Sequence, residues 1–171
     1  MLRSTAVRIG LVLVFASAVL AFAGSAFAAE LPTRAYLPLT KAVALAEHAV
    51  AACTEDGYKV SATVVGPAGV TKALQRADGA GPHTVYSSSR KAFTAASLGV
   101  STAELAKIAA KHPTAAGLRD MGPRILILAG GLPIKADDQV VGAIGVGGSP
   151  GGDLDQACAQ AAIDAVMGDG A

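Results

Sequence analysis

Two pairs of strand-like segments, each joined by a short connection, constrain the fold of this 171-residue chain most strongly. Residues 58–65 alternate in polarity and are rich in β-branched side chains, and after a Gly-Pro-Ala-Gly turn residues 70–76 resume an extended pattern. Residues 125–129 and 140–146 are apolar runs typical of buried strands, and we interpret residues 134–139 as the polar connection between them. Two hairpins predict antiparallel pairing and exclude the strand and helix alternation of a doubly wound parallel sheet.

Helical patterns occupy the segments around the hairpins, because apolar residues recur there at three- and four-residue spacings. Ser101 and Glu104 match a capping box at a helix start, and Asp153 and Gln156 form a second capping pair. The predicted helices cover residues 40–57, 85–98, 101–111 and 153–167, and residues 113–123 are expected to be irregular with a helical turn. The resulting order, helix-strand-strand-helix-helix-strand-strand-helix, predicts a single α+β domain with an antiparallel β-sheet flanked by helices.

Residues 1–28 have the pattern of a secretory signal peptide. Arg3 and Arg8 precede a short apolar run, and Ala26 and Ala28 are the small residues that a cleavage site requires. An uncleaved anchor is the alternative, but the run is short for a membrane-spanning helix. We therefore expect a periplasmic or secreted protein without stable membrane insertion, comprising an N-terminal arm (29–38), a domain (39–167) and a tail (168–171).

The charge of the chain argues against several classes of partner. Without residues 1–28, 143 residues remain, with 12 basic and 13 acidic side chains. A nearly neutral chain lacks the concentrated basic surface that nucleic acids require, and it has no polybasic segment for an anionic membrane. The four aromatic residues that remain give few stacking platforms for sugars or bases. A length of 143 residues is typical of one domain with one core.

The two cysteines, Cys53 and Cys158, lie near the end of the first predicted helix and near the start of the last. Antiparallel packing of these helices would bring the cysteines together, and an exported protein can keep a disulfide. Two free thiols buried in a helix interface are the alternative. The spacing of Cys and His residues does not indicate a structural zinc site.

His83 is the most promising of the three histidines, since it follows Gly-Pro on a short loop at the start of a helix and could point into a cleft. The alternative is an ordinary loop residue at a helix entry. Residues 147–152 form a glycine-rich turn before the last helix, where exposed amides could hold an anion. A flexible turn that lets the chain enter the helix is the other interpretation. Arg90 and Lys91 could meet ligand carboxylates or simply form a solvated helix face.

Support for nucleophilic catalysis is poor. Ser87, Ser88 and Ser89 are adjacent, but no Gly-x-Ser-x-Gly elbow surrounds them, and neither cysteine has an evident activating base. The close acidic pairs are explained by turns and helix caps. We therefore identify no catalytic residue.

Five stretches of the chain together resemble the haem-binding GlcG/HbpS-like family, which is related to the PduO C-terminal module. They are residues 79–84 (GAGPHT), 87–99 (SSSRKAFTAASLG), 130–133 (GGLP), 140–148 (VVGAIGVGG) and 153–162 (DLDQACAQAA). The resemblance covers about residues 39–166. It implies a small α+β domain with an antiparallel sheet, commonly assembled into homo-oligomers. Many relatives have an Asp-containing turn in the first hairpin, where this chain has Gly66-Pro67-Ala68-Gly69.

The resemblance implies haem as the ligand, with cobalamin as the alternative, and a role in haem or iron handling or sensing with at most weak haem-degrading activity. A haem site needs an apolar slot, an axial donor, and cations or amides for the propionates. His83 is the candidate axial ligand of the iron. The candidate cofactor-binding residues are His83, Thr84, Arg90, Lys91, Thr94, Gly147 and Gly148. Rival hypotheses are an accessory protein or enzyme acting on a corrinoid or small organic acid, and a structural partner without a small ligand.

Overall fold

The computed structural model describes residues 31–168, and one compact unit begins at Arg34. The predicted signal peptide and residues 169–171 of the predicted tail lie outside the described residues. In the part that is described, no helix is long and apolar enough to cross a membrane.

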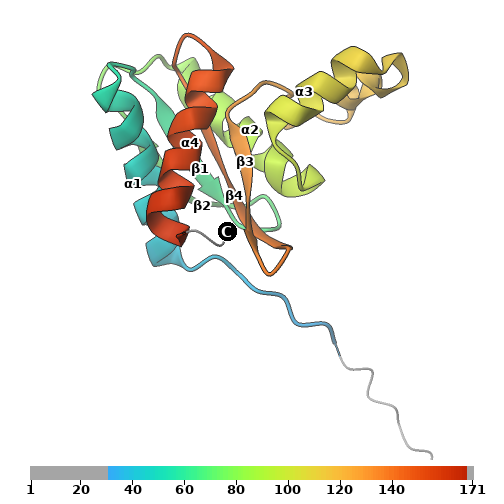
Figure 1. Ribbon diagram of the computed structural model, residues 1–171, viewed down its shortest axis with the longest axis horizontal. Coiled ribbons are helices and arrows are strands. Elements are labelled where there is room, and N and C mark those ends of the chain that lie inside the picture. Colours follow the sequence, from blue (N-terminus) through green and yellow to red (C-terminus); the bar gives the residue numbers. More distant parts are fainter. Residues whose placement is uncertain (1–30, 169–171) are drawn as a thin grey trace, which may run out of the picture. The chain divides into compact units, whose positions relative to one another are not determined.

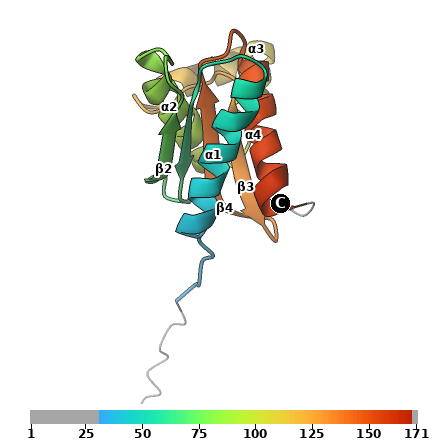
Figure 2. The same cartoon turned by 90° about the vertical axis from the view of Figure 1, so that its left-hand side faces the viewer.

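The folded unit is a four-stranded antiparallel sheet with helices on both faces. Its elements are α1 (Leu39–Glu55), β1 (Ser61–Val65), β2 (Thr71–Arg76), α2 (His83–Leu98), α3 (Thr102–Lys111), the 3₁₀ helix η1 (Pro113–Asp120), β3 (Gly131–Ala136), β4 (Gln139–Gly147) and α4 (Gly152–Met167). The strand order is β2-β1-β4-β3, so the two hairpins join through β1 and β4. Helices α1 and α4 cover one face and α2 covers the other (Figures 1 and 2). The predicted α+β class and element order are confirmed.

The hydrophobic core lies between the sheet and the pair α1 and α4. Apolar residues that recur along α1 face the sheet, and Leu45, Ala46 and Ala49 have no exposed surface. Val64 of β1 and Ile144 of β4 meet them from the sheet and are also fully buried. The alanines explain why two helices fit side by side on one face of a narrow sheet.

Helix α2 packs on the opposite face through hydroxyl groups and glycines as well as through apolar side chains. Ser61 Oγ lies 2.7 Å from Thr84 Oγ1, and Thr63 Oγ1 lies 2.8 Å from Ser88 Oγ, so β1 and α2 are joined by buried hydroxyl pairs. The alanine face of α2 contributes to a small cluster that comprises Val65, Ala92, Ala95, Ala96 and Ala143.

Gly145 of β4 allows α2 to approach the sheet closely. A Cβ at this position would overlap the carbonyl oxygen of Ser88 and lie 2.5 Å from the amide nitrogen of Ala92. Both atoms belong to the helix backbone, which cannot move away without shifting the whole helix.

Gly145→Ala should therefore lower the free energy of unfolding by about 1–3 kcal/mol, the usual cost of overpacking a core. Chemical denaturation measures the loss. Gly117→Ala in η1 is the matched control, since a Cβ there would have no neighbour within 4 Å. Equal stability of the two variants would show that α2 does not depend on this close contact.

The second hairpin differs from the prediction. Residues 125–129 form no strand, and the segment 134–139 is not a connection, because β3 spans Gly131–Ala136 and pairs with β4. Asp137 and Asp138 make the turn, with φ of 48° and 61°. Two left-handed residues match the twist of a tight two-residue hairpin. Ile125 is buried as predicted for an apolar run, but without strand pairing.

Two helix starts also differ from the prediction. The proposed capping pair at Asp153 and Gln156 is wrong, because α4 begins at Gly152 after an N-cap glycine with no side-chain cap. Helix α2 begins at His83, so this residue lies in the first helical turn and not on the preceding loop. The capping box at Ser101 is confirmed, since Ser101 Oγ accepts a hydrogen bond from the Glu104 amide at 3.1 Å.

Cys53 and Cys158 form a disulfide between α1 and α4, as expected from antiparallel packing of the first and last helices. Their Cα atoms are 5.5 Å apart, within the usual range for a disulfide. The alternative of two free thiols is therefore wrong for this structure. The bridge joins residues 105 positions apart and closes most of the domain into one covalent loop.

Candidate functional site

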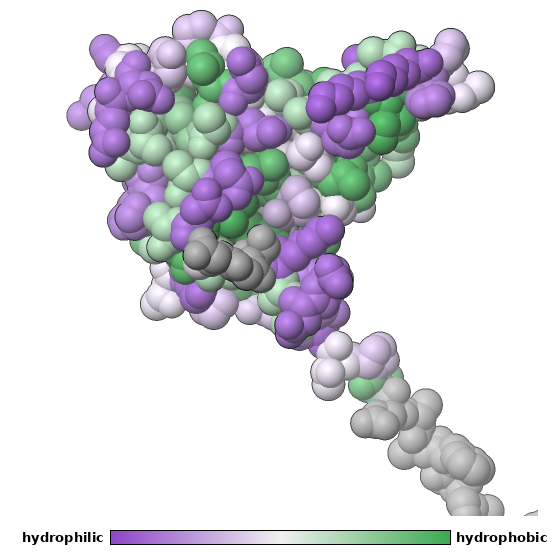
Figure 3. All heavy atoms as spheres, in the orientation of Figure 1, coloured by the Kyte–Doolittle hydropathy of each residue, from purple (hydrophilic) through white to green (hydrophobic). Residues whose placement is uncertain are grey.

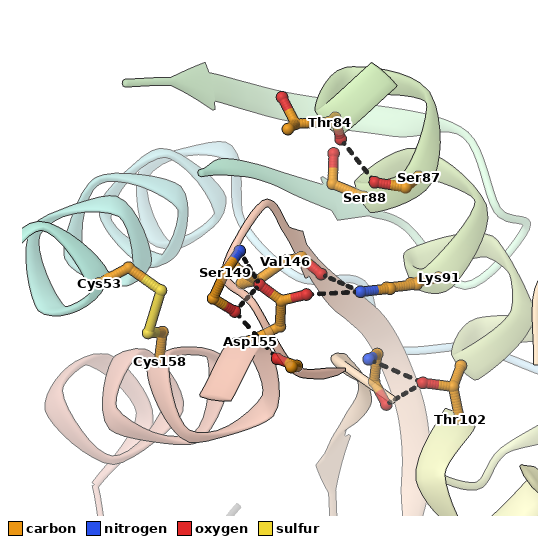
Figure 4. Close-up of polar contacts among 12 residues, drawn as sticks. Cys53, Thr84, Ser87, Ser88, Lys91, Thr102, Val146, Ser149, Asp155 and Cys158 are labelled. Atoms are coloured by element: carbon orange, nitrogen blue, oxygen red, sulfur yellow. Dashed lines mark hydrogen bonds and ion pairs between the residues drawn. A yellow bond between two sulfur atoms is a disulfide. The ribbon is translucent and has the colours of Figure 1, made fainter. Parts of the chain in front are cut away.

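A buried ion pair at the end of β4 connects helices from the two faces of the sheet (Figure 4). Lys91 Nζ of α2 lies 2.7 Å from Asp155 Oδ2 of α4 and donates to the Val146 carbonyl at 2.9 Å. The two side chains are only 2% and 4% exposed. The other carboxylate oxygen of Asp155 accepts a hydrogen bond from the Ser149 amide at 3.0 Å. Lys91 thus holds the end of β4 and orients Asp155, and Asp155 in turn holds Ser149 of the glycine-rich turn.

His83 and three other sequence candidates gather at the start of α2. Thr84 is buried, donates to the Gly81 carbonyl at 2.7 Å and contacts Ser61. Gly148 follows β4 with φ of 138°, and a Cβ there would lie 3.2 Å from Thr84 Cγ2. Gly147 is buried and packs directly against the Ser87 side chain. His83 itself is exposed, and its ring folds back over Gly81.

Arg90 and Thr94 lie elsewhere, on the side of α2 that faces residues 121–126. The Arg90 guanidinium donates to the Ile125 carbonyl and stacks on the Tyr86 ring at 5.1 Å. Thr94 Oγ1 accepts a hydrogen bond from the Leu126 amide at 2.8 Å and is fully buried. These contacts satisfy the backbone of a segment that forms no strand. The seven candidates therefore lie in three places. Four lie near the start of α2, Lys91 faces Asp155, and Arg90 and Thr94 face residues 121–126.

An apolar cavity of about 400 Å³ lies between α2 and the segment after η1. We call it the α2 pocket. It is lined by Phe93, Ser97, Leu98, Met121, Gly122, Pro123, Arg124 and Ile125. Arg124 stacks on the Phe93 ring at 3.7 Å and donates to the Gly69 carbonyl at 2.6 Å, so it bridges the pocket and the first hairpin.

The other cavities suit the expected ligand, an apolar ring with carboxylate groups, less well. A cavity between α1 and β2 is lined by Glu47 and Glu55, whose carboxylates would repel a negative ligand. A cavity beside the start of α3 is lined by Glu104 and Lys135 together with apolar groups. The cavity at the first hairpin measures only about 250 Å³. The α2 pocket alone among these four combines aromatic and aliphatic walls with an arginine.

Sequence reasoning missed the principal lining residues of the α2 pocket, including Met121, Phe93 and Arg124. Met121 is 59% exposed and lines the cavity, so it lies at the rim. The signal available in the sequence was the Met-Gly-Pro-Arg stretch at the end of the predicted irregular segment. In residues 31–168, no group of three or more His, Cys, Asp or Glu side chains is arranged to hold a metal ion.

The structure is a small α+β domain with an apolar cavity beside α2. Residues 37–164 match the family described as haem degrading protein HbpS-like. The chain belongs to this family.

Several solved structures share the fold. A double mutant of HbpS from Streptomyces reticuli is 43% identical, with a TM-score of 0.76, and the match covers 81% of this chain and 92% of that chain. Protein ORFY of Klebsiella pneumoniae is 32% identical, with a TM-score of 0.76 and coverage of 81% and 95%. A PduOC:heme complex, 23% identical with a TM-score of 0.71 and coverage of 77% and 95%, shows the same fold. A comparison with curated proteins found no match.

Proposed function

We propose that this chain is an exported haem-binding protein that acts in haem or iron handling or sensing. Three things support the proposal: membership of the HbpS-like family, the existence of a haem complex with the same fold, and the chemistry of the α2 pocket. Export rests on the signal-peptide pattern of residues 1–28.

The observation that carries the proposal is an apolar cavity with a cationic side chain in its wall. Ligand pockets are typically about 300–1,000 Å³ with mostly hydrophobic walls and few polar groups, and the α2 pocket has about 400 Å³. Phe93, Leu98 and Ile125 would contact a macrocycle, and Arg124 would pair with a propionate. The residues present therefore fit the edge of a haem. When bound, haem would supply an iron centre that can take further ligands.

We keep His83 as a proposed ligand of the haem iron, but its position restricts where the haem can lie. It lies ten residues before Phe93 on α2, which corresponds to about 15 Å along a helix. An imidazole cannot span this distance within one chain. His83 can therefore ligate a haem placed at the start of α2, near Thr84, Gly147 and Gly148, or a haem held in the α2 pocket of a second copy.

Adding hemin to the purified chain should produce a Soret band and raise the melting temperature. A ligand present at a hundred times its Kd stabilises the native state by about 2.7 kcal/mol. If His83 is the axial ligand, His83→Ala should weaken binding and change the spectrum, whereas His48→Ala on α1 should not. Unchanged affinity and spectrum for His83→Ala would remove His83 from the site. A wild-type chain that binds no hemin would contradict the proposed function.

The same thermal assay tests the rival ligands. Stabilisation by cobalamin or glycolate, with no response to hemin, would favour a corrinoid-binding or organic-acid-binding accessory protein or enzyme instead. Following the Soret band over time shows whether bound haem is retained or degraded. Light scattering of the apo and haem-loaded chain tests the expected homo-oligomer.

A further inference from the structure

The α2 pocket contains few atoms that could coordinate a metal. Its aliphatic and aromatic walls have none, and the guanidinium of Arg124 has no lone pair to offer. The remaining donors are the Ser97 hydroxyl and the Met121 thioether. Thr94 lies nearby, but its oxygen donates to the Arg90 carbonyl at 2.8 Å and accepts from the Leu126 amide, so it is already committed.

No histidine of the same chain can reach this pocket. His83 lies about 15 Å away along α2. His112 precedes η1 and lies nine residues before Met121, which corresponds to about 18 Å at the rise of a 3₁₀ helix. His48 lies on α1, on the other face of the sheet (Figure 1).

We propose that Met121 is an axial ligand of the haem iron when haem occupies the α2 pocket. The inference rests on the proposed function and deepens it by assigning the donor. A thioether is an established ligand of haem iron. Met121 follows η1 directly and is 59% exposed, so its sulfur can turn into the pocket without disturbing the core. The three rotatable bonds of a methionine side chain make this adjustment easy.

The charges around Met121 favour a dianionic ligand. Arg119 and Arg124 flank it in the sequence, and Arg90 approaches from α2 through its bond to the Ile125 carbonyl. The Nε atom of Arg90 is buried and has no hydrogen-bond partner among the described residues. A buried donor of this kind usually finds an acceptor. Asp120 is the one acidic neighbour in this stretch and is exposed, so the cations outnumber it.

The size of the pocket implies that haem is only partly enclosed. A volume of about 400 Å³ is near the lower end of typical ligand pockets, so a haem bound there would be only partly covered. Hydrophobic surface is visible below α3 (Figure 3). In the sequence, Val100 precedes α3 and Leu128 follows the lining residues 121–125, and both are exposed apolar residues. Met121 would thus hold the iron from the protein side, and the exposed part of the haem would face solvent or a second copy.

The test is hemin titration of the full folded chain with Met121→Leu, which keeps the volume of the side chain and removes the sulfur. We expect about tenfold weaker binding, equivalent to about 1.4 kcal/mol. We also expect loss of the near-infrared band of sulfur-ligated ferric haem, and a lower midpoint potential, since a methionine ligand raises the potential. Met167→Leu is the matched control, because Met167 lies at the end of α4 with its sulfur 3.8 Å from Lys41 Nζ.

Two results would overturn the assignment, and they can be distinguished. If the wild-type chain binds hemin and Met121→Leu has the same affinity, spectrum and potential, Met121 is not a ligand although the proposed function stands. If the wild-type chain binds no hemin, both proposals fail. A change with Met121→Leu that Met167→Leu does not reproduce supports the assignment. Met121→His should then restore tight binding with an imidazole spectrum.

Discussion

Replacing Asp155 by alanine should destabilise the fold by about 3–5 kcal/mol, because the change leaves the Lys91 ammonium buried without its counter-charge. Lys91 Nζ would keep only the Val146 carbonyl, and the Ser149 amide would lose its acceptor. Both charges are almost completely removed from solvent, so water cannot replace the missing carboxylate. Chemical denaturation monitored by circular dichroism measures the loss.

Two further variants make this result interpretable. Lys107→Ala removes the exposed pair between Lys107 and Glu104, whose charged groups are 3.6 Å apart, and should cost less than about 1 kcal/mol. The double variant Lys91→Met with Asp155→Leu should recover part of the loss, because an apolar pair leaves no buried charge. An Asp155→Ala chain as stable as Lys107→Ala would show that solvent reaches the ion pair.

Removing the Cys53–Cys158 disulfide should cost about 2–5 kcal/mol, the usual range for the loss of a native disulfide from a small domain. The residues are 105 positions apart, and the chain-entropy model gives about 4.7 kcal/mol for a loop of that length. The sulfurs are buried between α1 and α4, so the double Cys→Ala variant also leaves a small void in the core.

Melting curves with and without a thiol reductant measure this effect. The wild-type chain should melt at a lower temperature under reducing conditions, and the double Cys→Ala variant should melt at the same temperature in both. Thiol titration after unfolding confirms reduction. A fully reduced wild-type chain with an unchanged melting temperature would contradict the expected contribution of the bridge.

The fold could be predicted from the sequence where local patterns and packing agree. Three predictions are confirmed because each depends on one helix or one helix pair: the apolar spacing of α1, the capping box at Ser101 and the pairing of the cysteines. The second hairpin was placed wrongly because residues 125–129 are the more continuous apolar run. Burial of Ile125 against α2 satisfies that pattern without a strand, and the Asp137-Asp138 turn specifies the true register.

The candidate site was harder to predict because the function of a helical residue depends on which face it occupies. Arg90 and Lys91 are neighbours in the sequence, yet Arg90 faces the segment 121–126 and Lys91 faces Asp155 across the end of the sheet. Composition cannot separate these roles. Met121 could not be recognised either, since its place on a cavity rim depends on the path that the chain takes after η1.

The open sheet leaves two strand edges, and their residues limit how copies of the chain can associate. Pro133 interrupts β3 because it has no N–H to offer to an incoming strand, and Lys135 adds a charge to the same edge. At the other edge, β2 carries Lys72 and Arg76. Continuous strand addition, which drives fibrous aggregation, is disfavoured at both ends. A homo-oligomer would therefore have to use helical and loop surfaces, and strand exchange between copies is disfavoured by the same residues.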